Sequence, residues 1–126
     1  MRHLNILVVA NNPMVTTLLQ RLFNRQCPCD IDVAVDCTIA FNKSQQRHYD
    51  VIMTDVYIEE DRDGFGLINN IKHAASSLNS NTPVFFWGDK DPRYFVPFLK
   101  LDAEKFYKTP LSAKNIEEII NYLQKY

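Results

Sequence analysis

The fold is decided by Tyr49-Asp50-Val51-Ile52-Met53-Thr54-Asp55, an apolar run that ends in a carboxylate just before a polar loop. Such a run is typical of a buried parallel strand, and open α/β sheets bind ligands in the crevice beyond the carboxyl ends of their strands. Asp55 is therefore the first candidate site residue. A second apolar run, Ile6–Val9, ends at Ala10 and Asn11, where a phosphate- or metal-binding site would favour acids.

Strand and helix signals alternate along the chain, which indicates a parallel sheet covered by helices on both faces. The predicted strands are Leu4–Val9, Ile31–Val35, Val51–Thr54, Pro83–Trp87 and Glu104–Tyr107. The predicted helices begin at Pro13, near Thr38, near Gly64, at Asp91-Pro92 and after Ser112. The first helix is expected to bury Val15, Leu18, Leu19, Leu22 and Phe23, which recur at helical spacing. These signals predict βα units in a single domain that spans residues 1–126.

Composition excludes several classes of protein. The net charge of −1 gives no support to a nucleic acid or an anionic membrane as partner. No apolar run approaches the length that spans a bilayer, and the first residues do not form a signal peptide, so we expect a cytoplasmic protein. The odd number of cysteines, 3, argues against a secreted disulfide framework. Cys27-Pro28-Cys29 supplies only two metal ligands, and we interpret it as ordinary thiols.

The chain resembles the receiver domain of response regulators in two-component signalling over essentially its whole length. The resemblance rests on the order and spacing of Tyr49–Asp55, Asp63-Gly64, Thr82–Val84, Leu101–Ala103 and Lys108–Leu111. It implies a flavodoxin-like, doubly wound α/β fold with a five-stranded parallel sheet in the order 2-1-3-4-5 and five helices. It also implies an acceptor aspartate, a Mg²⁺ ion held by that acceptor and two acids, and a lysine and a hydroxyl that bind the phosphoryl group.

By this resemblance, Asp55 stands in the acceptor position. The acid pair after the first strand falls on Ala10 and Asn11, neither of which is charged, and only Asn11 offers an oxygen. The position of the hydroxyl that ends the fourth strand falls on Gly88. The chain therefore departs from the family pattern at several of the positions that support phosphoryl transfer.

The usual Lys-Pro pair is also altered, because the chain reads Lys108-Thr109-Pro110. Counting from Pro110 places Thr109 in the lysine position and Phe106 in the position of the family's switching aromatic residue. Counting from Lys108 places Lys105 in the aromatic position instead. Alternation of side chains along a strand suits Phe106 and would turn Lys108, the displaced candidate for a phosphate contact, away from the site.

Two functions from different classes follow from these departures. In the first, the chain is a pseudo-receiver, a phosphorelay module with an atypical acceptor site that signals by protein contact. In the second, Asp55 is still phosphorylated, and a weakened Mg²⁺ site is formed by Asp55, Asn11, Glu60 and Asp89. Two unit charges about 4 Å apart interact by roughly 4 kcal/mol at an effective dielectric near 20, so the loss of two acids favours the first function. Neither function makes the chain an enzyme beyond autophosphorylation or dephosphorylation at Asp55.

Aromatic residues crowd the segment around the fourth helix and fifth strand. They are Tyr94, Phe95, Phe98, Phe106 and Tyr107. One helix face cannot bury them all, and in receiver domains the surface of the fourth helix, fifth strand and last helix is a common contact surface. Together with Gly88, these residues are the predicted switch and interface set. The expected partners are a histidine kinase, a phosphotransfer protein or a downstream target, with a homodimer as an alternative.

Overall fold

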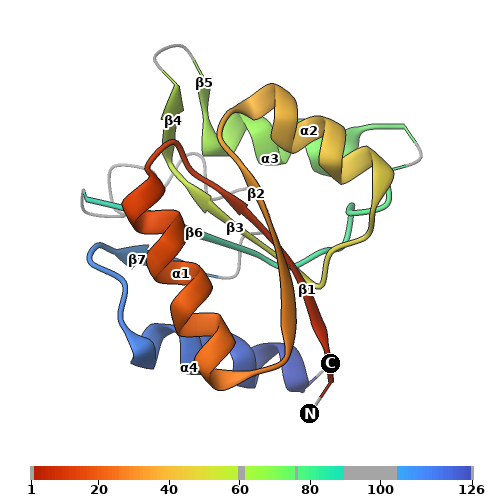
Figure 1. The fold of residues 1–126 in the computed structure, drawn as a ribbon. Helices are drawn as coiled ribbons and strands as arrows, with labels where there is room; N and C mark the ends of the chain where they lie inside the picture. Colours follow the sequence, from red (N-terminus) through yellow and green to blue (C-terminus); the bar gives the residue numbers. More distant parts are fainter. Residues whose placement is uncertain (1, 60–61, 76, 90–104, 126) are drawn as a thin grey trace.

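The sheet has the strand order that the sequence predicts. The computed structural model describes residues 2–59, 62–75, 77–89 and 105–125. Its main sheet is parallel, with the order β2-β1-β3-β6-β7 (Figure 1). These strands are β1 (Leu4–Val9), β2 (Cys29–Ala34), β3 (Val51–Asp55), β6 (Val84–Gly88) and β7 (Lys105–Lys108). In order along the chain they are the five predicted strands, so the order 2-1-3-4-5 is confirmed.

Helices cover both faces of this sheet. Helices α1 (Pro13–Gln26) and α4 (Ala113–Gln124) lie on one face, and α2 (Cys37–Gln46) and α3 (Gly64–His73) lie on the other (Figure 1). Each helix follows a residue whose side chain accepts a hydrogen bond from the first turn, as N-caps do. These caps are Asn12, Asp36, Asp63 and Ser112. The predicted helix at Asp91-Pro92 falls within residues 90–104, outside the described residues. None of the described helices is long and apolar enough to cross a bilayer.

The core has two layers, one on each face of the sheet. Beneath α1 and α4, strand residues such as Val8, Met53 and Trp87 pack with the apolar faces of both helices. Beneath α2 and α3, Ile52 and Phe86 pack with residues such as Ile68. Successive residues of β3 and β6 alternate between the two layers, which is why residues 51–53 and 84–87 are all apolar.

Two details differ from the prediction. Leu18 is 41% exposed, because α1 buries a narrow arc formed by Thr16, Leu19, Leu22 and Phe23, and Leu18 lies about 100° around the helix from Leu19. The segment between Asp55 and α3 was predicted as a loop, but it contains a short antiparallel pair, β4 (Tyr57–Glu59) and β5 (Arg62–Asp63). Ile58 anchors this hairpin by entering the layer beneath α2 and α3.

Gly64 lets α3 begin directly against the end of β3. A Cβ atom at this position would overlap the carbonyl oxygen of Asp55 and would crowd the Oγ1 atom of Thr54, at 3.1 Å. The backbone N–H of Gly64 donates to the carbonyl oxygen of Val56 at 2.7 Å. The glycine of the Asp63-Gly64 pair is therefore required by close packing beside Asp55.

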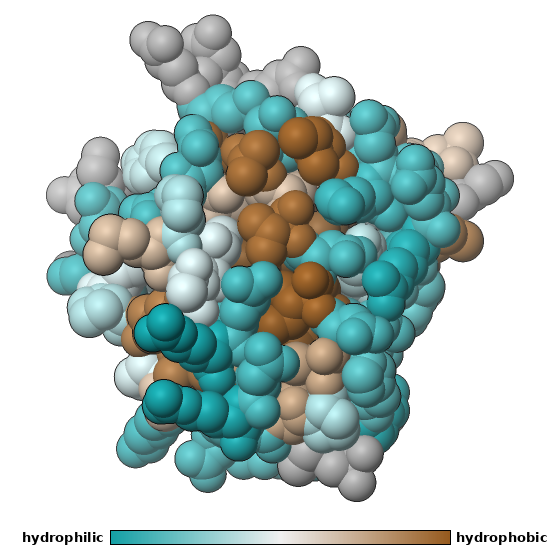
Figure 2. Space-filling view, in the orientation of Figure 1, coloured by the Kyte–Doolittle hydropathy of each residue, from teal (hydrophilic) through white to brown (hydrophobic). Residues whose placement is uncertain are grey.

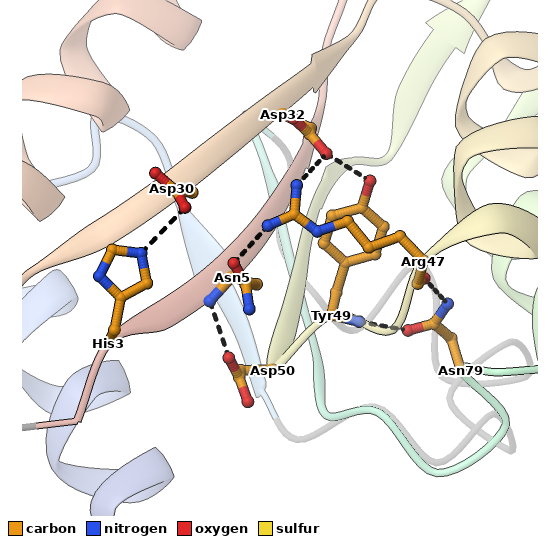
Figure 3. Close-up of polar contacts among 8 residues, drawn as sticks. All are labelled: His3, Asn5, Asp30, Asp32, Arg47, Tyr49, Asp50 and Asn79. Atoms are coloured by element: carbon orange, nitrogen blue, oxygen red, sulfur yellow. Dashed lines mark hydrogen bonds and ion pairs between the residues drawn. The ribbon is translucent and has the colours of Figure 1, made fainter.

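A polar network lies near the amino-terminal ends of β1 and β3, away from Asp55 (Figure 3). The carboxylate of Asp32 accepts hydrogen bonds from the hydroxyl of Tyr49, at 2.6 Å, and from the guanidinium of Arg47, at 3.2 Å. The guanidinium of Arg47 also donates to the side chain of Asn5. The side-chain oxygen of Asn79 accepts from the backbone N–H of Tyr49 at 2.8 Å. These contacts hold β2, β1, the end of α2 and the loop after α3 together.

Candidate functional site

Asp55 ends β3 at the carboxyl edge of the sheet, beside the β4–β5 hairpin (Figure 1). It lies in register with Trp87 of β6, and it is half-buried. Its Oδ1 atom accepts a hydrogen bond from the backbone N–H of Tyr57 at 3.1 Å. The structure therefore places Asp55 where the sequence predicts it, in the crevice beyond the strand ends.

The surroundings of Asp55 disfavour its charge. Burial raises the pKa of this carboxyl above its ordinary value, and the negative charge of Asp89 raises it further. Backbone N–H groups of Tyr57 and Val56 and the side chain of Trp87 act in the opposite direction by hydrogen bonding, without cancelling the rise in pKa. No cationic side chain in the described part of the chain is among the groups that lower the pKa of Asp55.

Replacement of Asp55 by asparagine is expected to stabilise the fold at pH 7. The pKa of Asp55 is higher in the folded chain than in the unfolded chain, so ionisation of this carboxyl lowers the stability of the fold at a pH above the folded-state pKa. This loss of stability disappears as the pH falls below the unfolded-state pKa of about 3.9. Thermal unfolding should therefore show a higher midpoint for Asp55→Asn at pH 7 and a shrinking difference toward pH 3.5. Glu117→Gln, at an exposed position, is the control, and an unchanged or lower midpoint for Asp55→Asn would contradict the expected rise in pKa.

The residues after β1 bring no negative charge to Asp55. Ala10 is buried, and its N–H donates to the carbonyl oxygen of Ala34 at 3.0 Å. Asn11 is exposed and precedes Asn12, whose side chain caps α1. The positions that the family uses for two metal-binding acids thus hold a buried methyl group and an exposed amide.

Gly88 and Phe106 fit against each other at the ends of β6 and β7. A Cβ atom at Gly88 would lie 3.1 Å from the Cζ atom of Phe106 and 3.6 Å from the Cγ2 atom of Val56. The half-buried ring of Phe106 therefore occupies the space beside Gly88 that a larger side chain would enter. Lys105 is exposed and donates to Glu118 at 3.2 Å instead. Of the two alignments that the sequence leaves open, the structure brings Phe106, rather than Lys105, to Gly88.

Thr109 continues β7 beside the same strand end. Its N–H donates to the carbonyl oxygen of Gly88 at 2.9 Å, and its hydroxyl lies 3.4 Å from the same oxygen. The peptide bond between Thr109 and Pro110 is cis. Lys108 is exposed and stands one residue earlier, in register with Gly88. The hydrogen bonds to the carbonyl oxygen of Gly88 therefore come from Thr109 and not from Lys108.

The described residues offer a receiver-type magnesium site two carboxylates, whereas the resemblance implies three. Asp55 and Asp89 supply two carboxylates, Ala10 supplies no side-chain oxygen, and Asn11 supplies no charge. Within the described part of the chain, no group of three or more His, Cys, Asp or Glu residues lies together in a way that would hold a metal ion. Glu60, the remaining predicted ligand, lies outside the described residues. Mg²⁺ in proteins usually keeps several of its waters and takes one or two carboxylates, so the described edge supplies the charges of Asp55 and Asp89 but not those of the acid pair.

The predicted interface aromatics divide into two groups. Tyr94, Phe95 and Phe98 fall outside the described residues. Tyr107 is only 6% exposed, because its ring packs beneath α1 and α4, and its hydroxyl donates to Glu118 at 3.1 Å. Its inclusion among exposed contact residues was therefore wrong, since it points into the core while Phe106 points to the other face.

Sequence reasoning missed the hairpin, whereas it placed Trp87 at the end of the fourth strand, next to the site. The alternation of exposed Tyr57, buried Ile58 and exposed Glu59 is a strand signal, but it is too short to be distinguished from a loop. Glu59 also reaches the backbone N–H of Cys37, at 3.4 Å, and so links the hairpin to the start of α2. The position of Trp87 beside Asp55 depends on the pairing of β3 with β6.

The sequence matches the family model of the response regulator receiver domain over residues 6–121. The chain belongs to this family. Among solved structures, the receiver domain is similar to the chemotaxis response regulator CheY4 of Vibrio cholerae, with a TM-score of 0.84 and 16% identity, covering 97% of this chain and 99% of that one. It is also similar to the receiver domain of Francisella response regulator 1452, with a TM-score of 0.81 and 23% identity, covering 97% of each chain. At these identities the likeness shows the fold alone.

A third structural relative carries a metal ion. The receiver domain of sensor histidine kinase PA1611 from Pseudomonas aeruginosa has a TM-score of 0.83 and 17% identity, covering 99% of this chain and 100% of that one, and a magnesium ion is coordinated in its active-site cleft. Among curated proteins, the receiver domain is 36% identical over 75 residues to the sensor protein EvgS of Escherichia coli (strain K12). That match covers 60% of this chain and 6% of EvgS, so the chain spans a small fraction of this relative's length.

Proposed function

We propose that this receiver domain is an atypical module of two-component signalling that passes information by protein contact and accepts phosphate poorly at Asp55. The observation that carries the proposal is the replacement of the acid pair beside Asp55 by buried Ala10 and exposed Asn11. Phosphoryl transfer depends mainly on positioning and on neutralising charge, and each missing charge contact is worth about 4 kcal/mol at 4 Å and an effective dielectric near 20. We therefore expect Asp55 to hold the cation that its phosphorylation requires less tightly than an ordinary receiver domain does.

The end of β6 supports the same proposal. Gly88 offers no hydroxyl to a phosphoryl oxygen, and the ring of Phe106 lies where a side chain at position 88 would project. Thr109 has no charge, and Lys108 is exposed. An incoming phosphoryl group would thus meet few of the groups that usually hold it in place.

The partner surface in this proposal includes β7 and α4 together with the segment that contains Tyr94, Phe95 and Phe98. Of this surface the structure describes β7 and α4, where exposed Lys105 and Glu118 form an ion pair beside the buried ring of Tyr107. The partner is a histidine kinase, a phosphotransfer protein or a downstream target, and a second copy of the chain is the alternative. The part of this surface formed by residues 90–104 lies outside the described residues and stays a prediction.

A working acceptor is the second candidate function. It is favoured by the electrostatic influence of Asp89 on Asp55, which indicates that two carboxylates share this edge of the sheet. In this alternative, Asp89, Glu60 and Asn11 would replace the missing acid pair around Asp55.

Acetyl phosphate with Mg²⁺ separates the two functions. We expect no phosphoryl mass on the wild-type chain, because the charge of the new group would be left without a well-held cation, and no such mass on Asp55→Asn. Intact mass spectrometry reads the result, with an ordinary receiver domain in the same buffer as positive control. A phosphoryl mass on the wild type that is missing from Asp55→Asn would refute the proposal and establish the second candidate.

A further inference from the structure

Strand β2 is an edge strand whose outer side is free within the described part of the chain. It pairs in parallel with β1, and no other described strand pairs with it. The carbonyl oxygens of Pro28 and Ala34 accept from the N–H groups of Leu4 and Ala10, at 3.0 Å in both cases, so the even-numbered residues of β2 direct their backbone groups toward β1. The N–H and C=O groups of the alternate residues, which include Ile31 and Val33, therefore point outward.

An apolar stripe runs along this edge. Ile31 and Val33 are partly exposed, Val35 after the strand is 50% exposed, and Ile39 at the start of α2 is 38% exposed. Figure 2 shows a brown band down the middle of this face, in the region that lies between α1 and α2 in Figure 1. An edge strand with free backbone groups and apolar side chains is a template for the addition of another strand.

Acidic residues in and after β2 disfavour pairing of its outer edge with a second copy of the same strand. Asp30, Asp32 and Asp36 alternate with or follow the apolar residues. Asp32 is engaged by Arg47 and Tyr49, exposed Asp30 lies 3.0 Å from the Nε2 atom of His3, and one oxygen of Asp36 caps α2. An antiparallel second copy of β2 that keeps the apolar side chains on one face must align odd residues with odd and even with even. The central registers of this kind set Asp30 or Asp32 opposite an aspartate of the second copy, and like charges directly opposite one another are destabilising.

We infer that the edge of β2 binds an extended segment of a partner protein whose side chains alternate between apolar and basic. Its backbone would pair with the outward groups of Ile31 and Val33, its apolar side chains would extend the stripe, and its basic side chains would face Asp30 and Asp36. This is strand addition, in which backbone hydrogen bonds supply affinity and alternate side chains supply specificity. The inference does not depend on whether Asp55 is phosphorylated.

The test uses a blocked peptide of alternating lysine and valine, with the same residues in block order and an alternating glutamate–valine peptide as controls. In ¹⁵N amide-exchange experiments on the whole chain, we expect the alternating lysine peptide to protect the N–H groups of Ile31 and Val33. Those of Asp32 and Ala34 already bond to β1 and should change little. Neither control peptide should give this pattern, and its absence with the lysine peptide would overturn the inference.

A matched pair of variants at position 33 tests the backbone contact. Val33→Pro removes an outward N–H without removing a bond to β1, and edge strands tolerate proline at such positions. We expect Val33→Pro to raise the peptide Kd tenfold or more, whereas Val33→Thr, which keeps the N–H, should bind within threefold of the wild type. Equal binding by both variants would exclude strand addition, and far-ultraviolet circular dichroism checks that each variant is folded.

Charge reversal tests the choice of partner. Asp30→Lys, at an exposed position, should weaken binding of the lysine peptide severalfold and strengthen binding of the glutamate peptide.

Sedimentation tests whether a second copy of the chain occupies this edge instead. The wild type should form no dimer through the outer edge of β2. A dimer that Val33→Pro dissociates would overturn the inference, because the edge would then be occupied by a second copy.

Discussion

Replacement of Asn79 by alanine is expected to lower the free energy of unfolding by about 3 kcal/mol or more, because each buried polar group that loses its partner costs about 1–3 kcal/mol. Asn79 is 0% exposed. Its side-chain nitrogen donates to the carbonyl oxygens of Ser44, at 2.7 Å, and Arg47, at 2.9 Å. Its side-chain oxygen accepts from the N–H of Tyr49 and the hydroxyl of Thr82. Alanine would leave groups from three segments without their partner.

Urea or thermal unfolding measures this effect. A domain of this size has a total stability of about 5–15 kcal/mol, so the loss should lower the midpoint of thermal unfolding by about 10 °C. Asn81→Ala is the matched control, since Asn81 is exposed in the same loop, and it should change stability by less than about 0.5 kcal/mol. An equally small loss for Asn79→Ala would show that the loop tolerates the change and that Asn79 does not hold it in place.

Most of the fold could be predicted because its signals are local. The runs that form β1, β3 and β6 are mostly apolar, and the caps Asn12 and Ser112 mark two helix starts. The exposure of Leu18 could not be predicted, because helical spacing gives an apolar stripe but not the width of the sheet surface that covers it. The role of Asn79 was missed for a related reason, since its partners Ser44, Arg47 and Tyr49 lie 30 to 35 residues away in sequence.

The candidate site was predictable in its composition but not in its contacts. Asp55, Ala10, Asn11 and Gly88 follow from counting along the chain, because strand ends fix their positions. Whether Phe106 or Lys105 meets Gly88 depends on the pairing of β6 with β7, which sequence spacing left open. The fit of the Phe106 ring against Gly88 required the distance between them.

Restoring the acid pair, with Ala10→Asp and Asn11→Asp together, is expected to raise the affinity for Mg²⁺ about 30-fold or more, which corresponds to about 2 kcal/mol. Each new carboxylate beside Asp55 adds an attraction for a divalent cation that exceeds this figure before desolvation is counted. Desolvation reduces the gain, because position 10 is buried. Without Mg²⁺ the variant should be less stable than the wild type, since like charges then lie close to Asp55.

The single tryptophan, Trp87, reports on this edge because it lies in register with Asp55. Titration with Mg²⁺ should change its fluorescence at lower metal concentration in the restored variant than in the wild type. Asn69→Asp with Asn70→Asp adds the same charge at exposed positions on α3 and should behave as the wild type does. If the restored variant also responds no better than the wild type, the acid pair is not what limits metal binding. The cause would then lie in the other departures at this edge, Gly88 with Phe106 and the exposed Lys108, because they would remain unchanged in that variant.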